Sequence, residues 1–143
     1  MRGFSLVEVM VVLGIFIAVA GFTLFMGIDT IARGSAMSER DTLVSLLTSA
    51  RTAALANMNS VPQGVRIDAT SFTRFEGATY TADPSSYRTI ARTAAVSVTG
   101  PTLPVDIIFT QLSATTPGYS TITLSEAPAS YTVDVSSAGR IEW

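Results

Sequence analysis

The chain has no cysteine, histidine or lysine, and these absences exclude several common kinds of site. Without cysteine there is no disulfide, no thiolate nucleophile and no cysteine-ligated metal. Without histidine, the usual general base and the commonest metal ligand are missing. All nine basic residues are arginine, which excludes a Ser–Lys dyad and a lysine Schiff base. We therefore expect no bound metal, no cofactor and no enzymatic activity.

Charge is also scarce, because only 14% of the 143 residues are charged and the net charge is -2. Such a chain has no overall positive field with which to hold nucleic acid. Its length leaves room for one ordinary domain. Hydrophobic residues make up 48% of the chain and are concentrated in the first 28 positions. This uneven distribution predicts an apolar amino-terminal segment followed by one folded head.

The amino-terminal segment has the length of a membrane-spanning helix. From Val9 to Ile28 every residue is apolar, glycine or threonine. A secretory signal peptide would have a shorter apolar core with a small-residue cleavage site after it, and this segment lacks such a site. Arg2 favours a cytoplasmic amino terminus. We expect a retained anchor in the cytoplasmic (inner) membrane, with the rest of the chain exported.

Glu8 is out of place in a simple anchor. An ionised carboxylate in hydrocarbon costs several kcal/mol and normally marks a partner or a pathway. At about 1.5 Å per residue, Glu8 lies about one turn into a helix that begins at Phe4. If the chain were cut between Gly3 and Phe4, the new α-amine of Phe4 would be a suitable cation for this carboxylate, in the same chain or in a neighbouring one.

The stretch Gly3-Phe4-Ser5-Leu6-Val7-Glu8, followed by the apolar run, resembles the cleavage motif of type IV pilins and pseudopilins. The resemblance implies that a prepilin peptidase cuts after Gly3 and that Phe4 becomes N-methylated. It implies that Glu8 then pairs with the amino terminus of a neighbouring subunit during filament assembly. The implied partners are other subunits, the peptidase, an inner-membrane assembly platform and, before assembly, membrane lipid.

A helical pattern continues beyond the apolar run. Apolar residues recur at helical spacing at Ile31, Leu43, Leu47, Ala50, Ala54 and Met58. Pro62 prevents much further extension. The pattern predicts one helix from Phe4 to about Asn57, apolar all round in its first half and amphipathic in its second.

The rest of the chain is rich in Thr, Ser, Val, Ile, Gly and Pro, which is typical of short strands and turns. Strands are predicted at 65–67, 72–75, 95–98, 105–109, 121–124 and 131–135. Turns are predicted at Asp83-Pro84-Ser85, Gly100-Pro101, Pro117-Gly118 and Ser137-Ala138-Gly139. Tyr131, Val133 and Val135 share one face, and with Ile141 and Trp143 they predict a final hairpin.

These elements predict an α+β protein in which a long helix packs against one or two antiparallel sheets, as in pilins. The expected segments are a leader at 1–3, a transmembrane and filament-core helix at 4–28, an amphipathic helix at 29–60 and a β-rich head at 61–143. The phrases LLTSARTAALANM, VDIIF and VDVSSAGRIEW also resemble the GspH/FimT group of minor pilins and pseudopilins. The two resemblances together imply a structural subunit of a type IV pilus or a type II secretion pseudopilus.

Two other kinds of function remain open from the residues. Carboxylates could pair for acid/base work on a glycan, the candidates being Asp68, Glu76, Asp83 and Asp106. Arginines could gather and contact phosphates of DNA, the candidates being Arg66, Arg74, Arg88, Arg92 and Arg140. Some DNA-uptake members of the GspH/FimT group end in Gly-Arg-x-Arg, whereas this chain has Gly139-Arg140-Ile141-Glu142. We therefore expect solvated carboxylates and dispersed arginines.

Overall fold

A computed structural model describes residues 5–82, 87–118 and 120–143, except for the side chains of residues 23–33. One long helix is followed by a short 3₁₀ turn and eight strands. The bounds are α1 (Leu6–Leu55), η1 (Met58–Ser60), β1 (Gln63–Ile67), β2 (Ser71–Glu76), β3 (Arg88–Ala91), β4 (Ser97–Thr99), β5 (Val105–Phe109), β6 (Ser120–Glu126), β7 (Ala129–Val135) and β8 (Ile141–Glu142). The predicted α+β class is confirmed.

Helix α1 is continuous over 50 residues, as the unbroken apolar and then amphipathic pattern predicts. It ends at Leu55 because Asn57 has a left-handed backbone (φ 53°) that the helix cannot accommodate. The amphipathic helix therefore stops short of residue 60, and residues 58–60 form η1. Met58, expected on the buried face, lies beyond the helix and is 47% exposed.

Across the residues that the structure describes, no helix is long and apolar enough to cross a membrane. The membrane-spanning role expected for residues 4–28 stays a prediction, since Phe4 and several side chains of this segment lie outside the described set.

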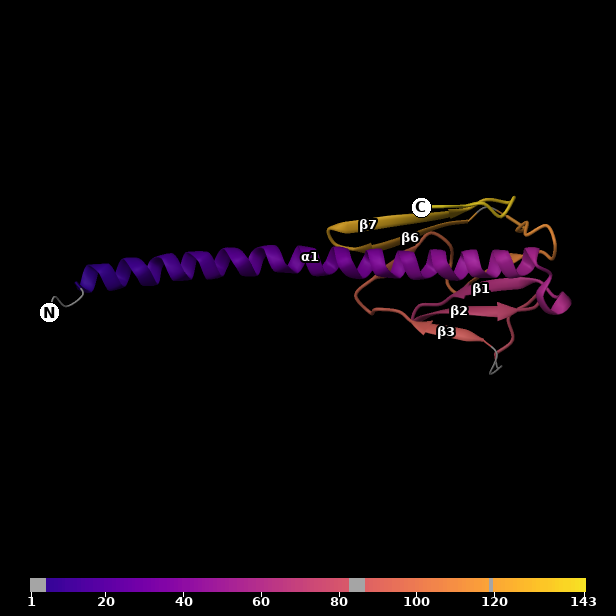
Figure 1. Cartoon of the computed structure of the whole chain (residues 1–143), viewed down its shortest axis with the longest axis horizontal. Helices are drawn as coiled ribbons and strands as arrows, with labels where there is room; N and C mark the ends of the chain where they lie inside the picture. The colour runs from indigo at the N-terminus through magenta and orange to yellow at the C-terminus, as the bar shows by residue number, and fades with distance from the viewer. Residues whose placement is uncertain (1–4, 83–86, 119) are drawn as a thin grey trace.

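The strands form two four-stranded antiparallel sheets with the carboxy-terminal half of α1 between them (Figure 1). Sheet A has the order β3-β2-β1-β5 and sheet B the order β4-β6-β7-β8. The predicted final hairpin is present, because Asp134 pairs with Glu142 and Val135 with Ile141. Strand β3 was not predicted, and the turn expected at 83–85 falls outside the described residues.

The core lies where the helix meets both sheets. Four of the predicted helix positions are fully buried, namely Leu43, Leu47, Ala50 and Ala54. They pack in one cluster with inward-facing residues of both sheets, including Val65, Ile67, Phe72, Ile107, Phe109, Ile122, Leu124, Val133 and Val135. The alternation along β7 follows the expected face, with Val133 and Val135 buried and Thr132 exposed. Burial of this shared apolar surface holds the helix in the head.

A buried ion pair fixes α1 where it enters the head. The Nε atom of Arg92 donates to Oε2 of Glu39 at 3.2 Å, and the two side chains are only 3% and 8% exposed. The backbone N–H of Thr93 donates to the other carboxylate oxygen of Glu39. Arg92 also donates to the carbonyl oxygens of Asp68, Ala69 and Val96 at 2.8–3.0 Å. This network joins the helix to the β1–β2 turn and to the β3–β4 connection.

Replacing Gly139 by alanine should destabilise the head by about 2 kcal/mol. Gly139 has φ +72°, and a Cβ atom there would overlap the carbonyl oxygen of Ala114. Gly118 has open space around it, so Gly118→Ala is the matched control and should change stability little. Thermal unfolding of both variants of the full chain measures the difference. Equal unfolding temperatures for the two variants would contradict the assigned backbone constraint.

Candidate functional site

The candidate site is the amino-terminal part of α1, which extends beyond the head (Figure 1). Every side chain described from Ser5 to Phe22 is exposed. The exposed fractions are large even for the bulkiest residues, at 77% for Leu6, 69% for Phe16 and 70% for Phe22. Monomeric soluble proteins rarely expose so continuous an apolar surface, and surfaces of this kind mark sites that meet another protein or a membrane.

Glu8 lies in the first turn of this exposed helix. Its backbone N–H donates to the carbonyl oxygen of Ser5 at 3.0 Å, and Ser5 makes no side-chain cap. A carboxylate in the first turn interacts favourably with the helix dipole. Within the described residues no cation pairs with Glu8, and its neighbours in the same shallow hollow are Val9, Val12, Leu13 and Phe16. The carboxylate is thus available to a cation from outside the described part of the chain.

The other two predicted site residues, Gly3 and Phe4, lie outside the described residues. Their roles in cleavage and N-methylation therefore stay predictions.

The candidate carboxylates are brought together only in part. Arg66 contacts two of them, with its Nε 3.2 Å from Oδ2 of Asp68 and its Nη1 3.3 Å from Oδ2 of Asp106. The same guanidinium stacks on the ring of Tyr80 at 4.2 Å from the centroid. Glu76 instead accepts a hydrogen bond from Asn59 at 2.8 Å, and Asp83 lies outside the described residues. A guanidinium between two carboxylates is an ion-pair network, which offers no support for glycan hydrolysis.

Within this network, the ionised carboxylate of Asp106 is expected to destabilise the folded state. Burial raises the pKa of Asp106 above its ordinary value of 3.8, Arg66 lowers this pKa and Asp68 raises it, and burial has the largest effect. A carboxyl whose pKa is raised by folding destabilises the folded state above that pKa, and the effect disappears below 3.8. Asp106→Asn should therefore leave stability unchanged or increased at pH 7, whereas Asp68→Asn should not increase it.

Denaturant unfolding of both variants at pH 7 and at pH 3 measures this difference. Any advantage of Asp106→Asn should vanish at the lower pH. A loss of stability in Asp106→Asn that is greater at pH 7 than at pH 3 would contradict the assignment.

The candidate arginines do not form one cluster. Arg92 is buried against Glu39, Arg66 is held by two aspartates, and Arg140 pairs with Glu142 at 2.8 Å. Arg74 and Arg88 alone are neighbours, since they face each other across β2 and β3. No local sequence pattern indicates that Arg74 and Arg88 are neighbours, because their contact depends on the unpredicted strand β3. In the described part of the chain, no group of acidic residues could hold a metal ion.

No protein-family model and no curated protein matches this chain in sequence. Among solved structures, the chain is similar to the crystal structure of the type IV minor pilin FimU of Pseudomonas aeruginosa (strain PAO1). The TM-score is 0.60 at 18% identity, over 77% of this chain and 88% of that one. The likeness shows a pilin-like fold.

Proposed function

We propose that this chain is a structural subunit, either a pilin or a minor pilin or pseudopilin, of a type IV pilus or a type II secretion pseudopilus. One observation carries the proposal. In the exposed part of α1 formed by residues 6–22, Glu8 is the single carboxylate and every other residue is apolar or glycine. This helix continues into a head of pilin-like fold. Such a helix needs partners along its whole surface, and other subunits with the same helix supply them.

The proposed sequence of events rests on the resemblance of residues 3–8 to the cleavage motif of pilins and pseudopilins. Before assembly the segment 4–28 resides in the cytoplasmic membrane, with the head exported. Cleavage after Gly3 by a prepilin peptidase frees the α-amine of Phe4, and an inner-membrane platform adds the subunit to the filament. Glu8 then meets the Phe4 amine of a neighbouring subunit. Because an unpartnered charge in low dielectric is heavily penalised, this pair selects the stagger between subunits more than it adds stability.

Processing at Gly3–Phe4 is the direct test. Intact-mass analysis of the protein isolated from membranes or filaments should show loss of Met1-Arg2-Gly3 and addition of one methyl group at Phe4. Sheared filaments that contain the chain in bulk would identify a major subunit, and trace amounts a minor one. Retention of the leader, or cleavage after the apolar run, would contradict the proposal.

A further inference from the structure

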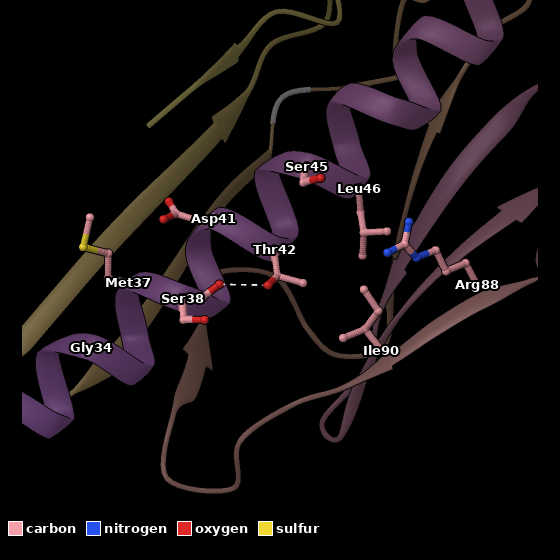
Figure 2. Close-up of a pocket in the computed structure, with 9 residues that line it drawn as sticks. All are labelled: Gly34, Met37, Ser38, Asp41, Thr42, Ser45, Leu46, Arg88 and Ile90. Atoms are coloured by element: carbon pink, nitrogen blue, oxygen red, sulfur yellow. Dashed lines mark hydrogen bonds between the residues drawn. The ribbon is translucent and has the colours of Figure 1, made fainter.

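Two arginines face each other on the helix-facing side of sheet A. Arg74 on β2 lies directly opposite Arg88 on β3. Arg88 lines a hollow of about 490 Å³ against α1, and Arg74 lines a second one of about 560 Å³. The two hollows share Ser45 of α1, so they adjoin along the open side of the helix. Figure 2 shows the first hollow, with Arg88 and Ile90 reaching from β3 toward Leu46.

This arginine pair lacks an anion within the described residues. Like charges directly opposite on neighbouring strands are destabilising. Arg88 has no carboxylate partner there, while Arg74 donates one hydrogen bond to Gln63 at 3.1 Å and leaves its buried Nε unbonded. Asp41 lines the same hollow as Arg88, but it is held by Arg40 at 2.7 Å and points away from Arg88 in Figure 2. The pair therefore favours an acidic partner from outside the subunit.

Sheet B carries the opposite arrangement. Asp134 on β7 lies directly opposite Glu142 on β8. Asp134 alternates with the buried Val133 and Val135, so it belongs to the outer face of the sheet. Its Oδ1 atom is buried without a hydrogen bond, and Glu142 is held by the exposed Arg140 at 2.8 Å. Among the described residues at this edge, Arg140 pairs with Glu142, and Asp134 has no cation of its own.

We propose that these two patches bind each other between neighbouring copies of this chain, the Asp134/Glu142 pair of one head contacting the Arg74/Arg88 pair of the next. The inference rests on the proposed function as a filament subunit. The patches differ, and they belong to sheets on opposite sides of α1 (Figure 1), so the contact is heterologous. A heterologous contact that does not close on itself generates an open helical array. Because Arg88 and Glu142 are exposed, salt weakens the contact.

Cysteine cross-linking tests the contact in the full chain, which has no cysteine of its own. An Arg–carboxylate pair holds its two Cα atoms farther apart than a disulfide spans, so a short bis-maleimide is the suitable reagent. The bis-maleimide is added to filaments sheared from cells that produce the Arg88→Cys/Asp134→Cys variant. It should give a ladder of cross-linked dimers, trimers and longer products. The matched control is Arg88→Cys/Thr99→Cys, because Thr99 is exposed on β4 at the other edge of sheet B. We expect at least about tenfold less cross-linked product from the control, given the high effective concentration of groups held at a contact.

The outcomes separate this inference from the proposed function. Filaments that contain the Arg88→Cys/Asp134→Cys chain but give no ladder above the control would overturn the inference and leave the subunit role intact. Absence of the wild-type chain from filaments would overturn both. Dimers from Arg88→Cys alone would indicate a symmetric contact and overturn the heterologous one. Loss of binding to a short DNA duplex in Arg74→Gln/Arg88→Gln, without any ladder in the cysteine pair, would assign the arginines to nucleic acid instead.

Discussion

Glu8→Gln and Glu8→Val should both leave a folded head in the membrane fraction and largely exclude the chain from filaments. Glu8 lies in the exposed first turn of α1, far from the core that begins at Ala36, so it does not contribute to folding of the head. Glutamine keeps the shape and much of the hydrogen bonding but removes the charge on which the proposed pairing with the Phe4 amine of a neighbouring subunit depends. Valine also lowers the penalty for residence in the membrane by a few kcal/mol.

The measurement is the amount of each variant in sheared filaments relative to the amount in membranes. Met10→Leu is the matched control, because Met10 is 66% exposed on the same helix and leucine conserves its volume. If the chain is a minor subunit, the defect should appear as fewer filaments or as lost incorporation. Normal incorporation of both Glu8 variants would falsify the pairing role, and loss of the folded head in either would indicate an ordinary structural carboxylate.

Glu39→Ala should destabilise the head by about 3–5 kcal/mol, because it leaves the buried guanidinium of Arg92 without its counter-charge. For a head of this size, that loss lowers the unfolding temperature by roughly 10 °C or more. Thermal unfolding of the full chain in detergent, followed by near-UV circular dichroism, measures the shift. Asp41→Ala is the matched control, since Asp41 pairs with Arg40 on the same helix but is 55% exposed. A surface pair of this kind contributes about 0–1 kcal/mol.

A second variant separates the lost charge from the lost packing. Glu39→Gln keeps the length of the side chain and an acceptor for Thr93, so its loss should be smaller than that of Glu39→Ala. Equal unfolding temperatures for Glu39→Ala and Asp41→Ala would show that the Glu39–Arg92 pair does not fix the helix in the head.

The helix and most strands were predictable because their patterns are local. The alternation in residues 105–109 matches β5, and the helical spacing of Leu43, Leu47, Ala50 and Ala54 matches the buried face of α1. Strand β3 was missed because Arg88–Ala91 is exposed at three of its four positions and so lacks the apolar alternation of a half-buried strand. The division into two sheets does not follow from the sequence, because turns locate the ends of strands but do not determine which strands pair.

Functional residues and ion pairs likewise differ in how far the sequence alone predicts them. Glu8 was identifiable from a short motif and an apolar run, both of which lie within neighbouring residues. The pairing of Glu39 with Arg92 spans 53 residues of sequence and depends on how α1 lies against the β3–β4 connection. The opposition of Arg74 and Arg88 likewise depends on the register of β2 and β3. Such contacts follow from tertiary geometry, which no local pattern contains.

The direction of the strands relative to α1 has a mechanical consequence. Figure 1 shows β1, β2, β6 and β7 running nearly along the helix axis, with a sheet on each side of α1. Hydrogen bonds between antiparallel strands are perpendicular to the strands. A tensile force along the axis of α1 therefore loads many of these bonds in shear at once, whereas a force across the strands would open them one after another. The head should therefore resist unfolding by a tensile force along α1 better than unfolding by a force across its strands.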